Sequence, residues 1–330
     1  MDRKKLAIIG CGGIGRYHLN HFRQFDDIEI AGVCDIILER AEAFAAEAHC
    51  KAFTHFKDMY GAVSPDMVFI CVPPTEHGEI ELETIRRGIH LFVEKPVALT
   101  KEKCIMLRDA IKASGVISAS GFQLRYESNI EKLKEFAKRH PIVEMNMMRL
   151  GGIPDTPWWK SRALSGGQIV EQTIHQFDMA RNIMGEPDTV FTLGGRNIVK
   201  EDGFDTEDMS VTLVRFQNGA LGTITTGCYA KNGACADNKL TFGAVDARAD
   251  YYMFDKVAVY GETQSQEDDA TAEVVKGDGR MKQLDAAIAY KPEGDCGILC
   301  DRTFIEAVQT GDASKIRSPY EDAVKSVLFT

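Results

Sequence analysis

The chain places Gly10-Cys11-Gly12-Gly13-Ile14-Gly15 directly after the apolar run Leu6-Ala7-Ile8-Ile9 and before a helical pattern. In such a unit Gly10 allows a tight turn, Gly12 lets the backbone approach a phosphate, and Gly15 lets the helix pack closely on the strand. The helix N-terminus adds unpaired N–H groups and the positive end of a dipole. The stretch therefore predicts a loop that binds a pyrophosphate.

Around this loop, apolar runs alternate with helical patterns. Continuous runs rich in β-branched residues, separated by helices, are typical of parallel strands that are buried on both faces. Residues 1–122 are therefore predicted to form an α/β domain of the doubly wound, Rossmann type that binds NAD(P). The expected strands are residues 6–9, 28–34, 67–72, 90–93 and 116–120, and the expected helices are 18–25, 37–48, 79–87 and 101–114.

Asp35 lies 20 residues after Gly15, at the end of the second expected strand. A carboxylate there can accept hydrogen bonds from a ribose diol; the alternative is that Asp35 caps the next helix. It would also repel the 2′-phosphate of NADP, and neither Ile36 nor Ile37 offers a positive charge. We therefore expect NAD to be preferred over NADP, although Arg40 lies only one turn further along.

The pattern changes after Phe122. Helices are expected at 129–139 and 169–184, and Asn218-Gly219 predicts a hairpin turn between strands 209–216 and 220–226. Paired strands and grouped helices indicate an α+β domain, so residues 123–330 are predicted to form a second domain. Two acidic stretches, 201–208 and 264–280, lack apolar periodicity and are predicted to be solvated loops.

Lys95 follows the apolar run 90–93, within Glu94-Lys95-Pro96. A lysine at the carboxyl end of a parallel strand faces the crevice where such sheets bind ligands, and Pro96 cannot continue an internal ladder. The alternative is a surface lysine that pairs with Glu94. The position favours a functional lysine.

The expected helix 169–184 places Glu171, His175 and Asp178 on one face. A histidine flanked by carboxylates suits proton transfer, but taken alone this pattern is more typical of a solvated helix face. Both tryptophans, Trp158 and Trp159, lie in a turn-rich stretch nearby. Stacking on a sugar and packing between domains are equally good interpretations of them.

No metal site is predicted. His18 and His21 have no carboxylate or cysteine beside them at helical spacing, so an exposed or capping pair is expected. Cys296 and Cys300 start an amphipathic segment without a second ligand pair, which favours core packing.

Charge and cysteine content exclude several classes of partner. A net charge of −10 and a pI near 5.4 disfavour nucleic acid and anionic membranes. No apolar run reaches the roughly 20 residues of a membrane span. The apolar run near the N-terminus is also shorter than the apolar region of a signal peptide. Nine scattered cysteines indicate reduced thiols. A cytoplasmic protein is expected.

Several motifs together resemble the glucose-fructose oxidoreductase, inositol dehydrogenase and rhizopine catabolism (Gfo/Idh/MocA) family. In chain order they are Val72-Pro73-Pro74-Thr75-Glu76-His77, Glu94-Lys95-Pro96, Gly121-Phe122-Gln123-Leu124-Arg125-Tyr126, Ser165-Gly166-Gly167 through Asp178, and Ser318-Pro319-Tyr320-Glu321-Asp322-Ala323. They run through nearly the whole chain.

The resemblance implies an NAD(P)-dependent oxidoreductase that exchanges a hydride with a carbinol carbon of a sugar, inositol or related polyol. It also implies a second domain with a large, mostly antiparallel open sheet, which commonly forms the contact of a homodimer or homotetramer. The implied catalytic residues are Lys95, His175 and Glu171, and the implied substrate contacts are these three with Arg125 and Trp159. The implied cofactor contacts are Gly10, Gly12, Gly13, Ile14, Gly15, Asp35, Arg40, Pro73, Pro74, His77, Glu94, Lys95 and Gln123.

The sequence departs from the family pattern in three places. Glu171 stands where aspartate is usual, Gln123 replaces an asparagine, and Lys160 replaces an arginine. The longer Glu171 side chain makes the substrate an open question. The chain also stops in a helical pattern at Thr330, so a natural C-terminus beyond this point is expected.

Two other functions remain open at this stage. One is an NAD-dependent glycosidase that oxidises its substrate transiently, eliminates the leaving group and reduces the product again. The other is a non-catalytic sugar or nucleotide sensor, which the presence of both Lys95 and His175 disfavours.

Overall fold

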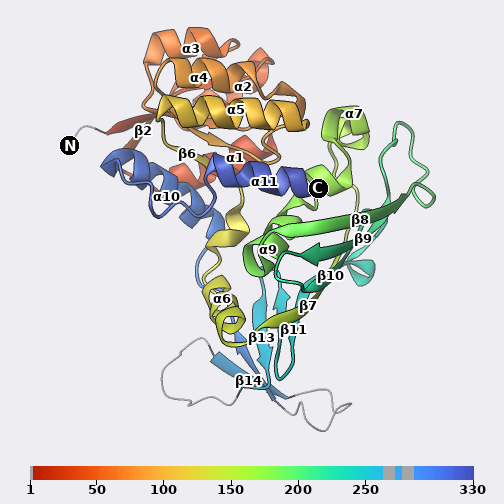
Figure 1. Cartoon of the computed structure of the whole chain (residues 1–330). Coiled ribbons are helices and arrows are strands. Elements are labelled where there is room, and N and C mark those ends of the chain that lie inside the picture. The colour runs from red at the N-terminus through yellow and green to blue at the C-terminus, as the bar shows by residue number, and fades with distance from the viewer. Residues whose placement is uncertain (1–2, 263–271, 277–285) are drawn as a thin grey trace. The chain divides into compact units, whose positions relative to one another are not determined.

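The computed structural model describes residues 3–262, 272–276 and 286–330 (Figure 1). The chain divides into two compact units. Unit 1 comprises Met1–Gln123 and Gly297–Leu328, and unit 2 comprises Leu124–Cys296 and Phe329–Thr330. The chain first passes from unit 1 to unit 2 after Gln123, one residue from the predicted boundary. The return of 297–328 to the first unit differs from the predicted division, which assigned that segment to the second domain.

Unit 1 contains a six-stranded sheet in the order β3-β2-β1-β4-β5-β6, with every neighbouring pair parallel. This arrangement is the predicted doubly wound α/β fold. The strands are β1 (Lys4–Ile9), β2 (Ile28–Cys34), β3 (Lys51–Phe53), β4 (Met67–Ile70), β5 (His90–Val93) and β6 (Ser118–Ser120), and the helices between them are α1 (Gly13–Phe22), α2 (Leu38–Ala48), α3 (Phe56–Val63), α4 (Glu79–Arg86) and α5 (Lys101–Ser114). β3 and α3 were not predicted; a strand as short as the three residues of β3 has too little apolar periodicity to be recognised.

The central strands are buried on both faces, which explains their continuous apolar runs. All four side chains of β4 are fully buried, as are Leu6, Ala7 and Ile8 of β1. Because the strands are parallel, the segments that follow β1, β4 and β5 all leave from the same edge of the sheet. That edge holds the glycine loop, the 71–77 segment and Lys95.

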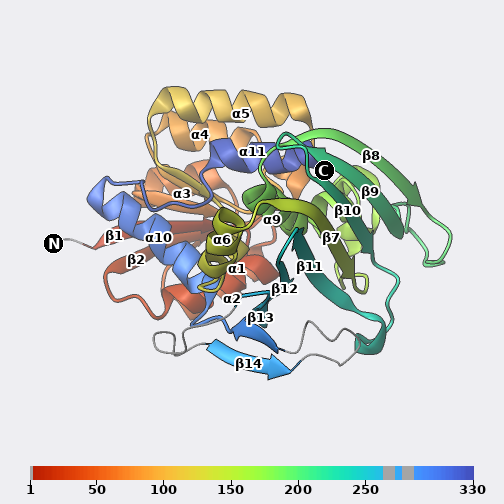
Figure 2. The ribbon, with the colours of Figure 1, turned by 60° about the horizontal axis from the view of Figure 1, so that its bottom comes forward.

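The C-terminal helices α10 (Cys296–Thr310) and α11 (Tyr320–Phe329) complete unit 1, as the blue segments in Figure 2 show. The Phe304 ring of α10 lies 5.5 Å from the Phe69 ring and 5.7 Å from the Phe92 ring, between centroids. Before α11, Ser318 accepts a hydrogen bond from Ser120 N–H and donates its own hydroxyl back to the Ser120 carbonyl. The late segment is therefore bound to the edge strand β6.

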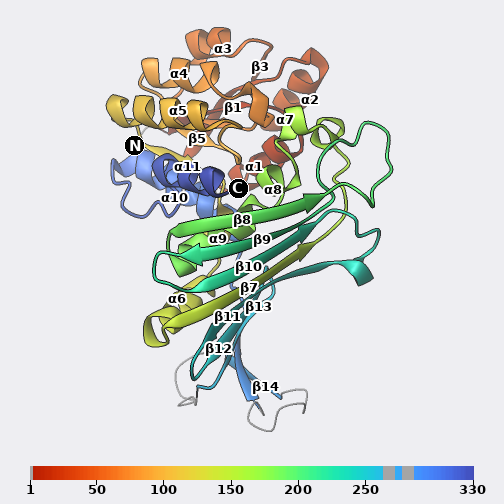
Figure 3. The same ribbon diagram turned by 45° about the vertical axis from the view of Figure 1, so that its right-hand side comes forward.

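Unit 2 contains a nine-stranded sheet in the order β14-β15-β13-β12-β11-β7-β10-β9-β8 (Figure 3). Only β7 and β10 pair in parallel, so the predicted mostly antiparallel sheet is confirmed. The predicted hairpin joins β9 to β10 through Gly219, whose φ is +88°. The strands are β7 (Ile142–Leu150), β8 (Pro187–Gly195), β9 (Met209–Phe216), β10 (Leu221–Gly227), β11 (Asp237–Ala244), β12 (Arg248–Tyr252), β13 (Lys256–Tyr260), β14 (Ala272–Lys276) and β15 (Ala286–Tyr290).

One face of this sheet forms the core of unit 2. It packs against the apolar sides of α6 (Ile130–Arg139) and α9 (Ile174–Met184), through side chains such as Phe136, Phe177 and Phe242. Along β9, buried and exposed residues alternate, and β8 is exposed along almost its whole length. Among the described residues, the opposite face of β8 and β9 is therefore uncovered.

The two predicted acidic loops have different outcomes. Residues 201–208 form a loop, but Thr206, Glu207 and Asp208 are buried, so the prediction of a solvated connection is wrong there. Of the stretch 264–280, residues 272–276 form β14 instead of a loop, and the other residues lie outside the described part of the chain.

Seven of the nine cysteines are buried. Burial raises the pKa of the Cys11 and Cys34 thiols to about 12, which keeps them neutral. Among the described residues, no helix is both long and apolar enough to cross a membrane.

The core of unit 2 also holds a carboxyl group, that of Glu127. Its Oε1 accepts a hydrogen bond from Phe254 N–H at 3.0 Å, yet burial raises the pKa of Glu127 from 4.5 to about 7. The raised pKa means that the folded protein holds this proton more tightly than the unfolded chain. Stability is therefore lost as the pH rises from about 4.5 through 7.

We predict that Glu127→Gln reduces this loss. The amide oxygen keeps the bond from Phe254 but carries no charge, so the variant should gain up to about 3 kcal/mol over the wild type between pH 5 and pH 8. Thermal melts of both proteins at the two pH values measure the difference. An equal fall in Tm for both would contradict the prediction, and the exposed Glu131→Gln serves as control.

Candidate cofactor and catalytic site

The glycine loop has two crowded glycines and two open ones. A Cβ on Gly10, whose φ is +92°, would lie 2.2 Å from the Cys71 carbonyl oxygen, and one on Gly15 would lie 2.1 Å from the Gly10 carbonyl oxygen. A Cβ on Gly12 or Gly13 would meet nothing within 4 Å. The loop is therefore packed on its inner side and open on its outer side, at the first turn of α1. This cradle fits the pyrophosphate of a dinucleotide.

Asp35 joins the glycine loop to the turn after β2. Its Oδ2 accepts a hydrogen bond from Cys11 N–H at 2.9 Å, and its Oδ1 accepts one from Ile37 N–H at 3.0 Å. Asp35 therefore binds a backbone N–H just before α2, as the helix-capping interpretation expected. Each carboxylate oxygen still keeps a lone pair for a ribose hydroxyl. Arg40 Nη1 lies 3.7 Å from Asp35 Oδ2, and the arginine side chain is half exposed.

His77 ends the loop that contains Pro73 and the short 3-10 helix η1 (Pro74–Glu76). Its Nδ1 lies 2.6 Å from Glu81 Oε1, and Glu81 Oε2 accepts a hydrogen bond from Gly78 N–H. The ring is 2% exposed, and its Nε2 has no hydrogen-bond partner within the described ranges. A buried ring nitrogen that is fixed in orientation and left unpaired suits a polar group of a bound ligand.

Lys95 lies at the carboxyl end of β5 and is half-buried. Its backbone N–H donates to Glu94 Oε2 at 3.1 Å, and a cis peptide bond joins it to Pro96. In the same unit, Gln123 Oε1 accepts a hydrogen bond from the Tyr17 hydroxyl at 2.7 Å. The amide is therefore held against α1.

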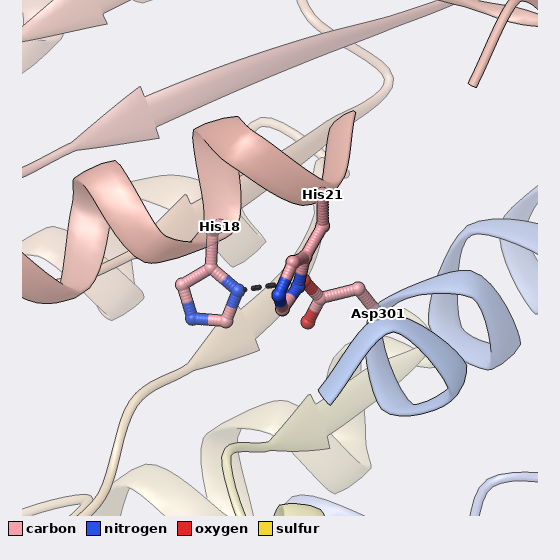
Figure 4. Close-up of side chains that lie close together, drawn as sticks. All are labelled: His18, His21 and Asp301. Carbon is pink, nitrogen blue, oxygen red and sulfur yellow. Dashed lines mark hydrogen bonds and ion pairs between the residues drawn. The ribbon is translucent and has the colours of Figure 1, made fainter. Parts of the chain in front are cut away.

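The expectation of an exposed or capping pair at His18 and His21 is wrong. Both rings are buried, and both Nδ1 atoms lie against one oxygen of Asp301, which belongs to α10 (Figure 4). Nothing in the local sequence of α1 signals this partner, because Asp301 lies 280 residues further along the chain than His21.

In unit 2, the predicted helix 169–184 is broken into α8 (Gln168–Glu171) and α9 (Ile174–Met184). Thr173 N–H donates to the Gln168 carbonyl, five residues back, and the Thr173 hydroxyl also bonds to backbone carbonyls of that turn. Glu171 ends the first helix, and His175 lies in the first turn of the second. The prediction of one continuous polar helix face is therefore wrong.

In the loop 201–208, the buried residues Thr206 and Glu207 fix the start of α8. Thr206 Oγ1 accepts a hydrogen bond from Gln168 N–H, and Glu207 Oε1 accepts one from Ile169 N–H at 3.0 Å. Gly167 has a φ of +100°, and a Cβ there would lie 2.7 Å from Glu207 Oε2. These contacts hold the short helix that carries Glu171, and they explain why acidic residues of this loop are buried.

Trp159 is 1% exposed and packs with Phe204 and Cys228. Its indole Nε1–H donates to Glu171 Oε2 at 2.5 Å. Of the two interpretations, the structure favours packing, within unit 2. It gives no support to a stacking contact between this ring and a substrate, but it gives Trp159 a role in orienting Glu171.

Arg125 is also buried, at 5% exposure. Its guanidinium forms a two-point ion pair with Asp178, at 2.8 Å and 2.5 Å. Buried bidentate pairs of this kind fix two elements relative to each other, here the 3-10 helix η2 (Gln123–Tyr126) and α9. This geometry gives Arg125 a structural role, and the expected substrate contact stays a prediction.

Comparisons with known proteins agree with this geometry. Residues 4–122 match the Gfo/Idh/MocA oxidoreductase family, NAD-binding Rossmann fold, and residues 141–267 match the Gfo/Idh/MocA C-terminal domain. A myo-inositol 2-dehydrogenase of Thermotoga maritima is 30% identical over 236 residues, which cover 69% of this chain and 70% of the relative. A 2,7-anhydro-N-acetylneuraminate hydratase of Escherichia coli is 26% identical over 309 residues, 87% of this chain and 80% of the relative.

A solved structure gives the same fold. Levoglucosan dehydrogenase, in complex with NADH and levoglucosan, superposes with a TM-score of 0.83 at 18% identity, over 99% of this chain and 95% of the other. This chain thus combines the family's order of motifs with a six-stranded parallel sheet and a large, mostly antiparallel sheet. The protein belongs to the Gfo/Idh/MocA family of oxidoreductases.

Proposed function

We propose that this protein is an NAD-dependent dehydrogenase that acts on one ring hydroxyl of a sugar, inositol or related polyol. The observation that carries the proposal is the edge of the parallel sheet in unit 1. There an open glycine loop, the Asp35 carboxylate and Lys95 follow β1, β2 and β5, which end at the same edge of one parallel sheet. The inositol dehydrogenase relative supports the substrate class.

When bound, NAD supplies the acceptor or donor of a hydride. The residues that would hold its pyrophosphate are Gly10, Gly12, Gly13, Ile14 and Gly15, and those that would hold the adenosine ribose are Asp35 and Arg40. Pro73, Pro74, His77, Glu94, Lys95 and Gln123 would hold the nicotinamide half. The preference for NAD over NADP rests on Asp35, whose charge repels a 2′-phosphate.

The proposed chemistry needs a group that polarises the substrate oxygen and a group that takes its proton. The Lys95 ammonium stabilises negative charge on the oxygen, and a ring nitrogen of His175 accepts the proton as the hydroxyl becomes a carbonyl. Glu171, held by the Trp159 indole, orients the substrate hydroxyl or the imidazole. In the reducing direction the same groups return the proton.

An elimination or hydration reaction is the second candidate function, because a relative that matches 87% of this chain is a hydratase. Net formation of NADH, read at 340 nm, separates the two. A dehydrogenase accumulates NADH in proportion to product, whereas a glycosidase or hydratase turns over with none. A sensor would bind NAD without any hydride exchange.

We also propose that the protein is a cytoplasmic homodimer or homotetramer. Cysteines that are mostly buried and scattered along the chain suit a reducing compartment. On the uncovered sheet face, Phe191 of β8 lies opposite Leu213 of β9, and they are 58% and 52% exposed. Leu193 and Leu221 extend this apolar face, which suits a second copy of the chain.

We predict that Lys95→Ala and His175→Ala each lower kcat at least about a hundredfold, since each removes an acid/base or polarising group. A screen of sugars and inositols first identifies a substrate that reduces NAD. Calorimetric titration should then give NAD dissociation constants within a few fold of wild type. The exposed Lys112→Ala and His55→Ala are the matched controls, and full activity in either site variant would refute the assignment.

For Asp35, we predict that Asp35→Asn weakens NAD binding about tenfold and lowers the ratio of NAD to NADP affinity, because it removes a charged acceptor and the repulsion of the 2′-phosphate. Asp35→Ala additionally leaves Cys11 N–H and Ile37 N–H without their acceptor, so it should lower Tm as well. Equal affinities of the wild type for NAD and NADP would overturn the proposed preference.

For the assembly, we predict that Phe191→Lys with Leu213→Glu shifts the protein to monomers. The two residues are direct cross-strand neighbours, so the opposite charges keep the sheet stable while the apolar surface is lost. Light scattering after gel filtration measures the mass. Val245→Glu, at a 90% exposed turn position, is the control; an unchanged oligomer in the double variant would contradict the proposed interface.

A further inference from the structure

Four titratable side chains of unit 1 form a buried chain of contacts, and three of them, His18, His21 and Asp301, have no part in the proposed chemistry. His18 Nδ1 and His21 Nδ1 lie 2.8 Å and 2.7 Å from Asp301 Oδ2. His18 Nε2 lies 3.1 Å from Glu94 Oε1. Figure 4 shows the two imidazoles of α1 converging on the carboxylate of α10.

The spacing is that of direct hydrogen bonds. Two ligands on a tetrahedral metal ion, each about 2.0 Å from it, lie about 3.3 Å apart, which is longer than both distances to Asp301. His18 also has a carboxylate at each of its ring nitrogens. A ring that donates from both nitrogens is an imidazolium, which offers no lone pair to a metal.

The charges around His18 support this protonation state. Burial lowers the pKa of His18, but Asp301 and Glu94 outweigh burial and raise the pKa to about 10. Tyr17 of α1 and the Cys71 thiol after β4 also face the cluster, and burial raises the pKa of the Cys71 thiol, which keeps that thiol neutral. The remaining wall is aromatic, formed by Phe22, Phe69 and Phe92.

Glu94 connects this cluster to Lys95. One carboxylate oxygen of Glu94 lies against His18, and the other accepts the Lys95 backbone N–H. A Cβ on Gly121 would lie 2.2 Å from Glu94 Oε1, so only glycine leaves room for the carboxylate there. The turn at the end of β5 is thus held by a charge-assisted bond on one side and by close packing on the other.

We propose that His18, held by Asp301, is a positioning residue that fixes the Glu94 carboxylate and through it the main chain of Lys95. The effect of His18 on catalysis rests on the proposed function of Lys95. The protonation of the His18 ring and its bond to Glu94 are independent of that proposed function. His21 shares the Asp301 oxygen, but among the described residues it makes no hydrogen bond to Glu94, which makes it the matched control.

The kinetic test compares His18→Gln, Asp301→Asn and His21→Gln. We expect His18→Gln to lower kcat by roughly tenfold to a hundredfold, since small misplacements of a catalytic group have costs of this order, with KM and the NAD dissociation constant changed less than about threefold. His21→Gln should stay within about twofold of wild type. If His18→Gln folds, binds NAD and keeps its kcat, the proposal is overturned while the dehydrogenase assignment stands.

The pH profile distinguishes positioning from simple loss of packing. Asp301→Asn removes a charge that raises the His18 pKa, so His18 should become neutral at an accessible pH and, with a single N–H left, no longer donate from both ring nitrogens. The variant should therefore lose kcat as the pH rises through that lower pKa, in a step that the wild type lacks between pH 6 and pH 9. An identical profile in both proteins would contradict the proposal.

Nitrogen-15 NMR of the His18 ring gives a readout that needs no activity. With and without NAD, both ring nitrogens should be protonated in the wild type at pH 8, and not in Asp301→Asn. This measurement remains decisive where a variant is unstable or no substrate is found. A neutral His18 at pH 7 in the wild type, or one equivalent of zinc in the purified protein, would overturn the proposal.

Discussion

The lack of any side chain at Gly10 and Gly15 is the constraint on which unit 1 depends. Each backbone lies so close to a carbonyl oxygen that even a methyl group would have to move the sheet or the helix. This contact brings the start of α1 to the edge of the sheet, where its free N–H groups are open to an anion. The same contact places the middle of α1 beside the end of β5, so one helix serves both the phosphate loop and the buried histidines.

Several buried charges of both units are paired, because an isolated charge in a core is strongly unfavourable. In unit 1, Asp301 and Glu94 enclose His18. In unit 2, Arg125 pairs with Asp178, and Glu207 accepts backbone N–H groups at the start of α8. These pairs lie beside the proposed catalytic residues, so their rigidity sets the positions of Lys95 and Glu171.

Much of the first unit could be predicted from the sequence because its signals are local. The glycine spacing, the apolar runs and the position of Asp35 each lie within a single strand, turn and helix. For the second unit, the fold class could be predicted, but the helix bounds and the burial of individual side chains could be predicted less well. The break at Thr173 depends on backbone bonds that hydrophobic periodicity does not report, and the burial of Glu207 depends on α8, almost 40 residues earlier.

The sequence by itself determined the fold class, the family resemblance and the candidates Lys95, Glu171 and His175, since these rest on motifs of fixed spacing. Only the tertiary structure decided what the neighbouring side chains do. It returned α10 to the first unit, gave His18 and His21 their shared carboxylate, and turned Trp159 and Arg125 inward to Glu171 and Asp178. Such contacts join residues far apart in the chain or across a helix break, where periodicity carries no information about partners.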